Sequence, residues 1–324
     1  MTILVTGSAG HLGEALMRTL RDQGRRVRGI DIKPSPFTDM TGSITDPDFI
    51  RRAMTGITAV IHAATLHKPH VATHGRQDFV DTNITGTLNL LEEAVAARVR
   101  AFVFTSTTST FGLALVPPAG EPAAWITESV VPVPKNIYGV TKVAAEDLCE
   151  LARRDHGLPC IVLRTSRFFP EDDDDDHARE RFPGDNLKVS EYLYRRVDIE
   201  DVVDAHLLAL HKAPEIGFAR YIISATTPFT RDDLPELRGD AAAVVRRRVP
   251  AYEAEYARRG WAMAASIDRV YVNERARSEL GWRPRHDFAA LVARLSAGED
   301  FRSALALTVG AKGYHREATF PYTQ

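Results

Sequence analysis

Three glycines near the start of the chain, Gly7, Gly10 and Gly13, constrain its fold more than any other feature. They directly follow a short apolar run at residues 3–5, and this order predicts a buried strand, a tight turn and the start of a helix. Glycines let the backbone approach a ligand closely, while the N–H groups at the helix start face an anion. The segment therefore favours a binding turn for the phosphates of a dinucleotide over a glycine-rich turn without a ligand.

An acidic residue, Asp31, ends the second predicted strand at residues 25–31. It lies 18 residues after Gly13, close to the roughly 20 expected for the acid that binds an adenosine ribose. A carboxylate at this place accepts from the ribose hydroxyls and repels a 2′-phosphate, so we expect NAD as the cofactor rather than NADP. The cations Arg28 and Lys33 are close to Asp31 in sequence, so NADP stays an alternative cofactor. The alternative interpretation of Asp31 is an ordinary turn residue at the end of a strand.

Apolar strand patterns alternate with helical patterns along the first half of the chain. Strands are expected at residues 58–62, 101–106 and 158–164, and helices at residues 79–97 and 138–156. This alternation predicts an α/β fold with a Rossmann-type doubly wound parallel sheet, whose ligands bind at the carboxyl ends of the strands.

The regular alternation ends at about residue 166, beyond which prolines and charge clusters become frequent. We therefore expect an NAD-binding domain at residues 1–166. Residues 167–324 are expected to form a mostly substrate-binding region, with a segment at about 195–225 returning to the main body.

The composition describes a protein without a strongly charged surface. The 324 residues include 41 basic and 43 acidic ones, a net charge of −2, so nothing indicates nucleic acid or a membrane surface as a partner. The apolar runs are too short to span a membrane, and the chain begins directly with a strand, so we expect no signal peptide. The two cysteines, Cys149 and Cys160, suit a reducing cytoplasm and are expected to be packing residues.

Polar side chains follow the expected strands at the edge where ligands would bind. The fourth strand runs into hydroxyl residues at 105–110, and Tyr138 and Lys142 are one helical turn apart on one face of the next helix. An ammonium beside a phenol favours the phenolate and lowers the pKa of the tyrosine, which can then exchange a proton with a substrate oxygen while hydride moves at carbon. A surface pair on the helix is the alternative, and the preceding glycine turn favours the catalytic interpretation.

A series of short segments resembles the extended short-chain dehydrogenase/reductase superfamily, in its NAD-dependent epimerase/dehydratase branch. They are residues 6–13, 29–31, 62–64, 83–87, 104–107 with 111–112, 138–142, 163–164, 198–201 and 280–284. The resemblance implies NAD as the cofactor, a sugar-like small molecule as the substrate, and a homodimer that forms through the helices at residues 79–97 and 138–156.

The resemblance also implies roles for individual residues. The cofactor-binding residues would be Gly7, Ala9, Gly10, His11, Leu12 and Gly13 in the turn, Asp31 at the adenosine ribose, Asp46 and Ile44 at the adenine, and Ala63, Ala64 and Thr65 after the third strand. Thr107 would be the hydrogen-bond partner of the reacting oxygen, and Tyr138 the acid–base group. Lys142 would bind the nicotinamide ribose beside Tyr138, and Asn83 would support the active site.

The residues after Thr107 depart from the dehydratase pattern of this family. Dehydratases and decarboxylating members carry acidic residues shortly after the catalytic threonine, whereas this chain has Thr108 and Ser109. An elimination needs an added acid or base there, and a hydroxyl is a poor substitute at neutral pH. The sequence therefore counts against a dehydratase or decarboxylase, and leaves epimerisation through transient oxidation, or a net oxidation or reduction.

Two further positions depart from the nucleotide-sugar members of the family and leave the substrate open. Arg167 stands near the place of an asparagine that contacts the sugar diphosphate, and Asp198 replaces a histidine. Arginine can hold a phosphate or carboxylate through two parallel hydrogen bonds, or it can pair with a structural acid. His67, Lys68 and Thr108 are further candidates for substrate contact.

Two other polar stretches carry weaker signals. His70 and His74 have helical spacing, but Pro69 and Gly75 indicate a loop rather than the fixed ligands that a metal site needs. The acidic run at residues 171–176 is typical of a solvated loop, although it could also bind a cation, or form a substrate lid by pairing with Arg179 and Arg181 or with a partner subunit. The tail at residues 309–317 indicates no mechanism.

Together these patterns predict an enzyme: a cytoplasmic NAD-dependent oxidoreductase or epimerase that acts on a sugar or nucleotide-sugar hydroxyl. A net dehydrogenase or reductase of a non-nucleotide substrate is the alternative, favoured by Arg167 and Asp198. A regulatory protein that binds NAD(H) without turnover is a third interpretation, and the presence of Thr107, Tyr138 and Lys142 argues against it.

Overall fold

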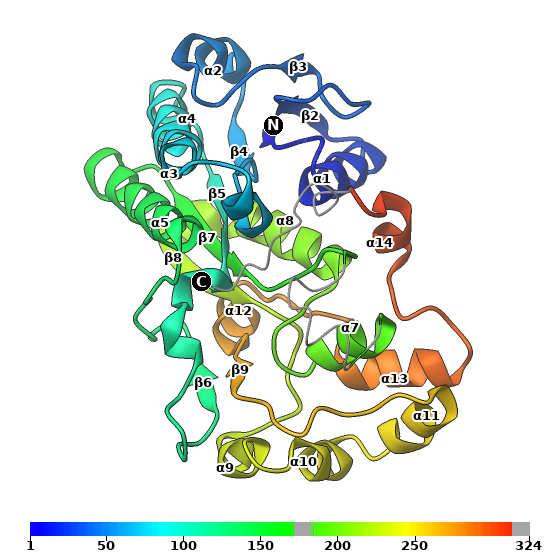
Figure 1. Ribbon diagram of the computed structural model, residues 1–324. Coiled ribbons are helices and arrows are strands. Elements are labelled where there is room, and N and C mark those ends of the chain that lie inside the picture. Colours follow the sequence, from blue (N-terminus) through cyan, green and yellow to red (C-terminus); the bar gives the residue numbers. More distant parts are fainter. Residues whose placement is uncertain (172–181, 183, 313–324) are drawn as a thin grey trace.

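The computed structural model describes residues 1–171, 182 and 184–312. Its centre is a seven-stranded parallel sheet in the order β3-β2-β1-β4-β5-β7-β8 (Figure 1). The strands are β1 (Thr2–Thr6), β2 (Arg26–Asp31), β3 (Met40–Thr41), β4 (Ala59–His62), β5 (Phe102–Thr107), β7 (Cys160–Thr165) and β8 (Phe218–Ile223). The predicted doubly wound α/β fold is confirmed.

The strand order reverses beside β1, because the chain continues to β2 on one side and later returns to β4 on the other. At such a reversal the loops that follow neighbouring strands diverge and leave a crevice at the carboxyl edge of the sheet. The glycine turn follows β1 directly and therefore lies at this crevice.

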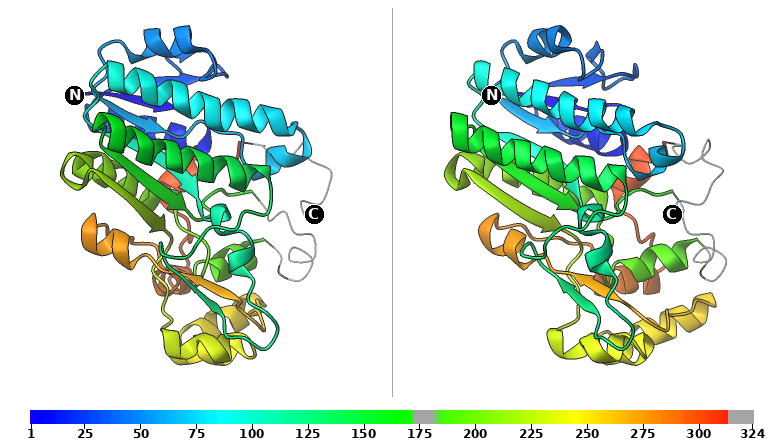
Figure 2. Two further views of the ribbon diagram at one scale, coloured as in Figure 1. Left: turned by 90° about the vertical axis from the view of Figure 1, so that its left-hand side faces the viewer. Right: turned by 60° about the vertical axis from the view of Figure 1, so that its left-hand side comes forward.

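Helices cover both faces of the sheet (Figures 1 and 2). On one face lie α1 (His11–Asp22), α8 (Ile199–Ile216), α12 (Glu274–Glu279) and α14 (Ala304–Val309). On the other lie α2 (Pro47–Met54), α4 (Gly86–Ala96) and α5 (Ile137–His156), with α3 (Arg76–Phe79) and a π-helical turn, η2 (Val80–Thr85), leading into α4. Successive residues of β1 point to opposite faces, so Ile3 and Val5 join one apolar core and Leu4 joins the other.

A smaller lobe lies beyond the carboxyl edge of the sheet and has its own apolar core (Figure 1). It contains α7 (Asp185–Glu191), α9 (Leu234–Leu237), α10 (Ala241–Arg248), α11 (Tyr252–Arg259), α13 (Phe288–Ser296) and a parallel pair of strands, β6 (Ala124–Ile126) and β9 (Arg269–Tyr271). The short 3₁₀ turns of the chain are η1 (Lys68–Ala72), η3 (Thr108–Phe111), η4 (Leu113–Leu115) and η5 (Arg231–Asp233).

The expected division near residue 166 is crossed by the chain in both directions. Before it, β6 leaves the main body and pairs with β9, because Ala123 and Trp125 pack into the core of the smaller lobe. After it, α8 and β8 return to the main body, and α12 and α14 return once more. The two parts are therefore interleaved rather than consecutive.

The fold gives the places of the two cysteines and the character of the helices. Both cysteines are unpaired and buried in the same apolar core, Cys149 on α5 and Cys160 on β7, as expected of packing residues. Among the described residues, every helix is too short or too polar to cross a membrane.

Candidate active site

A cavity of about 560 Å³ runs along the carboxyl edge of the sheet and reaches the smaller lobe. The residues expected in the site that line it are Gly7, Ala9, Gly10, His11, Leu12, Gly13, Asp31, Ile44, Ala63, Ala64, Thr65, His67, Lys68, Thr107, Thr108, Tyr138 and Arg167. The structure thus brings most of the expected site together, with Asp46 and Lys142 set back from the cavity wall.

The glycine turn leaves no room for side chains at two of its three glycines. Gly7 has a φ of +73°, and a Cβ atom there would lie 2.8 Å from the backbone nitrogen of Ala64. A Cβ atom on Gly13 would lie 1.9 Å from the carbonyl oxygen of Gly7. Gly10 is the N-cap of α1, and the first residues of the helix line the cavity, where the N–H groups of a helix start attract an anion. This cradle fits the diphosphate of a dinucleotide.

Asp31 lies at the end of β2 with its carboxylate held by two backbone groups. Oδ2 accepts from the N–H of Ala9 at 3.0 Å, and Oδ1 accepts from the N–H of Lys33 at 2.8 Å. Each carboxylate oxygen keeps a second lone pair that can accept from a ribose hydroxyl. Arg28 is engaged elsewhere, donating to the carbonyl oxygens of Ala53 and Thr55.

Asp46, expected at the adenine, caps a helix next to the cavity, and its adenine contact stays a prediction. It is exposed and caps α2, where Oδ1 accepts from the N–H groups of Asp48 and Phe49 at 3.0 and 3.2 Å. A proline follows directly at the first helical position, where its missing N–H is not needed. Asp46 is therefore at a strong capping site. The polar residue that lines the cavity beside Ile44 is Ser43, which the sequence interpretation missed.

Buried side chains hold the loop after β4 in place. The N–H groups of Ala63 and Ala64 donate to Thr6 Oγ1 at 3.1 and 3.0 Å. Asn83, on the π-helical turn η2, accepts from Thr65 Oγ1 at 2.8 Å and donates to Thr141 Oγ1 of α5 at 3.0 Å. Asn83 therefore ties this loop to α5.

Thr107 and Tyr138 both line the cavity. Thr107 ends β5, and its Oγ1 accepts from the N–H of Ser109 at 3.1 Å. Tyr138, in the first turn of α5, shares a side-chain hydrogen bond with Thr107. Burial raises the pKa of the Tyr138 phenol to about 12, although the hydrogen bond to Thr107 opposes this rise. The phenol therefore keeps its proton at neutral pH.

Lys142 does not produce the lowered tyrosine pKa that the Tyr-x-x-x-Lys spacing suggested. Its ammonium donates to the carbonyl oxygen of Thr105 at 2.7 Å and lies 4.0 Å from the centre of the Phe104 ring. Burial lowers the pKa of Lys142 to about 7, against the opposing charge of Glu146. The expectation for the pKa of Tyr138 was wrong because burial of the phenol dominates and the ammonium is engaged elsewhere.

The substrate end of the cavity is rich in cations. Arg167 and Lys68 line it as expected, and the sequence interpretation missed Arg195 and Arg269. Arg195 pairs with Glu191 at 2.5 Å, and Arg269 lies 3.4 Å from Asp268.

Two buried polar atoms at this end lack a hydrogen-bond partner among the described residues, namely Nε of Arg269 and Oγ of Ser166. Both residues line the cavity. A buried polar group without a partner is unfavourable, so such groups next to a cavity commonly mark where a ligand supplies one. The arrangement suits a substrate that carries an anionic group and hydroxyls.

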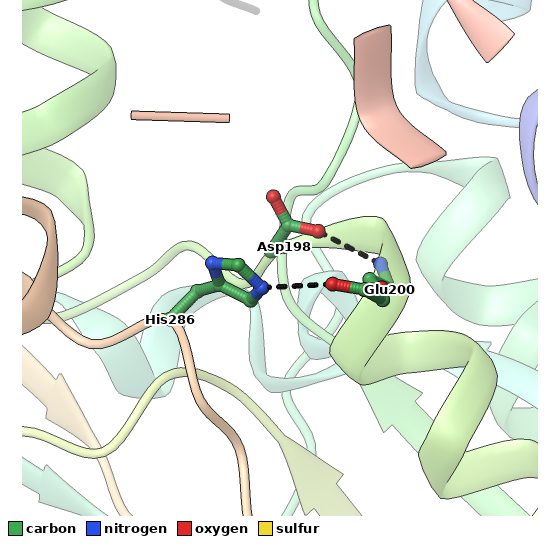
Figure 3. Close-up of side chains that lie close together, drawn as sticks. All are labelled: Asp198, Glu200 and His286. Atoms are coloured by element: carbon green, nitrogen blue, oxygen red, sulfur yellow. Dashed lines mark hydrogen bonds and ion pairs between the residues drawn. The ribbon is translucent and has the colours of Figure 1, made fainter. Parts of the chain in front are cut away.

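Asp198, which departs from the family pattern, lies away from the cavity wall. It caps α8, accepting from the backbone N–H groups of Glu200 at 2.8 Å and of Ser303 at 3.1 Å. Figure 3 shows it beside Glu200, which bonds to His286 at 3.0 Å. Asp198 therefore has a structural role, and it carries no information about the substrate.

Two groups of possible metal ligands make contacts with protein atoms. Ligand atoms of Asp198, Glu200 and His286 lie within 4.8 Å of one another, where Asp198 caps α8 and Glu200 bonds to His286. His70 accepts from the backbone N–H of His67 at 3.0 Å and packs edge-on against His74.

Of the acidic run, residues 172–176 lie outside the described residues, as do residues 313–317 of the tail.

Comparison with known proteins gives one family. Residues 3–221 match the model of the NAD dependent epimerase/dehydratase family. A UDP-glucose 4-epimerase of Rhizobium meliloti (strain 1021) is 28% identical over 330 residues, which cover 89% of this chain and 94% of that protein. A dTDP-glucose 4,6-dehydratase of Streptomyces antibioticus is 29% identical over 339 residues, which cover 91% of each chain.

A solved structure supports the same assignment. A short-chain dehydrogenase/reductase superfamily protein of Agrobacterium tumefaciens, with bound NAD, is 27% identical and superposes with a TM-score of 0.63. The match covers 92% of this chain and 98% of that one. The fold similarity therefore extends through the smaller lobe.

Proposed function

The chain belongs to the NAD-dependent epimerase/dehydratase family, and we propose that it is an oxidoreductase or epimerase of a sugar hydroxyl in which Tyr138 moves the proton. The family is NAD-dependent, so the cofactor is NAD, which when bound accepts and returns a hydride. Gly7, Gly10 and Gly13 would hold the diphosphate, and Asp31 the adenosine ribose. The collisions that a Cβ atom would make at Gly7 and Gly13 support this fit.

The observation that carries the proposal is the Thr107–Tyr138 pair in the wall of the same cavity as the glycine turn. Thr107 would hold the reacting oxygen through its hydroxyl. In the reducing direction, Tyr138 would donate its proton to a carbonyl oxygen, and a phenol with a pKa of about 12 is ready to do so at neutral pH. In the oxidising direction the phenol must first lose its proton, and its raised pKa makes this step unfavourable at neutral pH.

The residues next to Thr107 support redox chemistry or epimerisation over elimination. Thr108 and Ser109 both begin the turn η3, and Thr108 lines the cavity. Their hydroxyls are poor acids and bases at neutral pH, so they would not supply the extra proton transfer of a dehydratase. We therefore propose a hydroxyl of a sugar or nucleotide sugar as the reacting group, with His67, Lys68 and Thr108 as substrate contacts.

A second candidate is a net dehydrogenase or reductase of an anionic substrate without a nucleotide. Arg167, Arg195 and Arg269 line the substrate end of the cavity, and guanidinium groups hold carboxylates as readily as phosphates. A nucleotide-sugar diphosphate would also satisfy these cations, so the charge favours an anion without choosing between the two substrates. A regulator that binds NAD(H) without turnover is a third candidate, disfavoured by the intact pair of Thr107 and Tyr138.

Product analysis separates these candidates. The protein is incubated with NAD and a panel of neutral sugars, sugar acids, sugar phosphates and nucleotide sugars, while NADH absorbance and product stereochemistry are followed. Inversion without net NADH supports an epimerase, and a net rise of NADH supports a dehydrogenase. Tight binding of NADH without reaction across the panel would overturn the enzymatic proposal. Tyr138→Phe serves as the inactive control.

Two further properties belong to the proposal. We propose a homodimer formed through α4 and α5, which pack side by side and carry the partly exposed apolar side chains Leu88 and Leu151. A cytoplasmic location is also proposed, since Cys149 and Cys160 are both unpaired. Sedimentation of the purified protein would test the dimer.

A further inference from the structure

The end of the described chain lies at the cofactor end of the cavity. Lys312 lines the cavity together with the glycine turn, although it is 301 positions from His11 in sequence. It follows α14, the last helix of the described chain, which packs against α1 and α8 (Figure 1).

The segment that brings Lys312 there, residues 303–312, is anchored at its start and near its end. Ser303 donates its backbone N–H to Asp198, the cap of α8, at 3.1 Å. Val309 is 6% exposed and belongs to the same apolar core as Leu12 and Leu16 of α1. The path of the segment over α1 is therefore fixed by packing and not only by the contacts of Lys312.

Lys312 joins the glycine turn to the loop after β7. Its backbone N–H donates to Glu171 Oε1 at 2.9 Å, and the same oxygen lies 2.9 Å from His11 Nε2. Burial opposes ionisation of Glu171, but the hydrogen bond and charge of His11 outweigh it and lower the pKa of Glu171 to about 2. Three segments distant in sequence thus meet at one ionised carboxylate beside the first residue of α1.

The ammonium of Lys312 pairs with Glu14, in the first turn of α1. The Glu14 side chain is 9% exposed and also accepts from Arg18 at 2.8 Å. A carboxylate in the first turn of a helix competes with a bound diphosphate for the positive end of the helix dipole. Lys312 offsets this negative charge at the turn where the diphosphate would bind.

We propose that residues 303–312 form a strap that closes the cofactor end of the site and slows the release of NAD, with Lys312 as its positioning residue. The inference rests on the proposed function for the identity of the cofactor. The strap acts in two ways: Lys312 cancels the charge of Glu14, and its contact with Glu171 holds His11 at the start of α1. It makes the last part of the chain a component of a site otherwise formed by the first half.

Binding of NADH, followed by its fluorescence, tests the strap without any substrate. Lys312→Met should raise the Kd of NADH about fivefold, mostly through faster dissociation, because one partly buried ion pair near the diphosphate is lost. Glu171→Gln should give a similar increase, and Lys312→Arg should restore most of the affinity. Lys212→Met, which removes an exposed partner of Glu215 on α8, should leave the Kd unchanged.

Salt separates a charge effect from a structural one. The difference between Lys312→Met and the unaltered chain should shrink as the salt concentration rises, since salt screens the charge of Glu14. Unchanged NADH affinity in both Lys312→Met and Glu171→Gln would overturn the strap. So would a loss of affinity that Lys312→Arg fails to restore. An unaltered chain that does not bind NADH would overturn the proposed function itself, and with it the strap.

Discussion

The two ends of the cavity are built in different ways. At the cofactor end, Gly7, Gly13 and Asp31 come from one strand–turn–helix–strand unit, and they offer backbone groups and missing side chains. At the substrate end, Arg167 and Arg269 come from a loop after β7 and from β9, and they offer long charged side chains.

The two ends should therefore respond to different kinds of substitution. A close backbone approach tolerates almost no substitution, so the cofactor end should respond to a single added methyl group. Long arginine side chains act through charge, so the substrate end should respond to loss of charge and should choose among substrates. Thr107 and Tyr138 lie where the two ends meet, and they should matter to turnover whatever the substrate.

The largest effect is expected at this meeting point. Tyr138→Phe should lower kcat by about 10³-fold, because general acid–base catalysis is lost, while the Kd of NADH stays within about twofold. Tyr252→Phe is the matched control, since its hydroxyl bonds to the carbonyl of Ala242 in the smaller lobe. Steady-state rates with NADH titrations measure both. A Tyr138→Phe protein that turns over normally would remove Tyr138 from the mechanism.

The second effect probes the cofactor end. Gly13→Ala should weaken NADH binding at least about tenfold and lower the Tm, because overpacking against the backbone of Gly7 costs about 1–3 kcal/mol. Gly239→Ala provides the control, since the nearest atom to a Cβ there is 3.9 Å away and its φ is ordinary. Equal NADH affinities in the two variants would contradict the tight backbone cradle.

The third effect probes the substrate end. Arg269→Met should raise the KM for an anionic substrate about tenfold, because a charge-assisted hydrogen bond is lost, and leave the Kd of NADH unchanged. Arg246→Met removes an exposed ion pair with Glu253 in the same lobe and should alter neither quantity. If Arg269→Met weakens NADH instead, the division of the cavity into two ends is wrong.

The fourth effect concerns the choice of cofactor. Asp31→Ala should raise the Kd of NAD about tenfold, because a hydrogen-bonding carboxylate is lost at the ribose, and should affect NADP less. Asp22→Ala, at the exposed end of α1, is the control. A larger loss for NADP than for NAD would refute the assignment of Asp31.

The same contrast explains how much of the site the sequence reveals. Gly7, Gly10, Gly13 and Asp31 could be found because each is set by its neighbours within one local unit. The parallel sheet followed from alternating apolar patterns for the same reason. The capping role of Asp46 and the position of Ser43 in the cavity wall did not follow from the sequence pattern, because both depend on where α2 begins.

Residues that arrive from a distance could not be predicted. Arg269 reaches the cavity only because β9 pairs with β6, which comes from the first half of the chain. Lys312 does so because α14 packs back onto α1. The pKa of Tyr138 was also beyond sequence reasoning, since helical spacing gives its distance along α5 from Lys142 and not the burial that controls it.

Transfer of deuterium tests the central claim most directly. A substrate found active in the panel is labelled with deuterium on the carbon of the reacting hydroxyl, and the label is followed by mass spectrometry. The account predicts that the deuterium moves to the nicotinamide in a net oxidation, or returns to the same carbon of the inverted sugar, without exchange with water. Loss of the label to solvent would show that the carbon is deprotonated, and would contradict hydride transfer at this site.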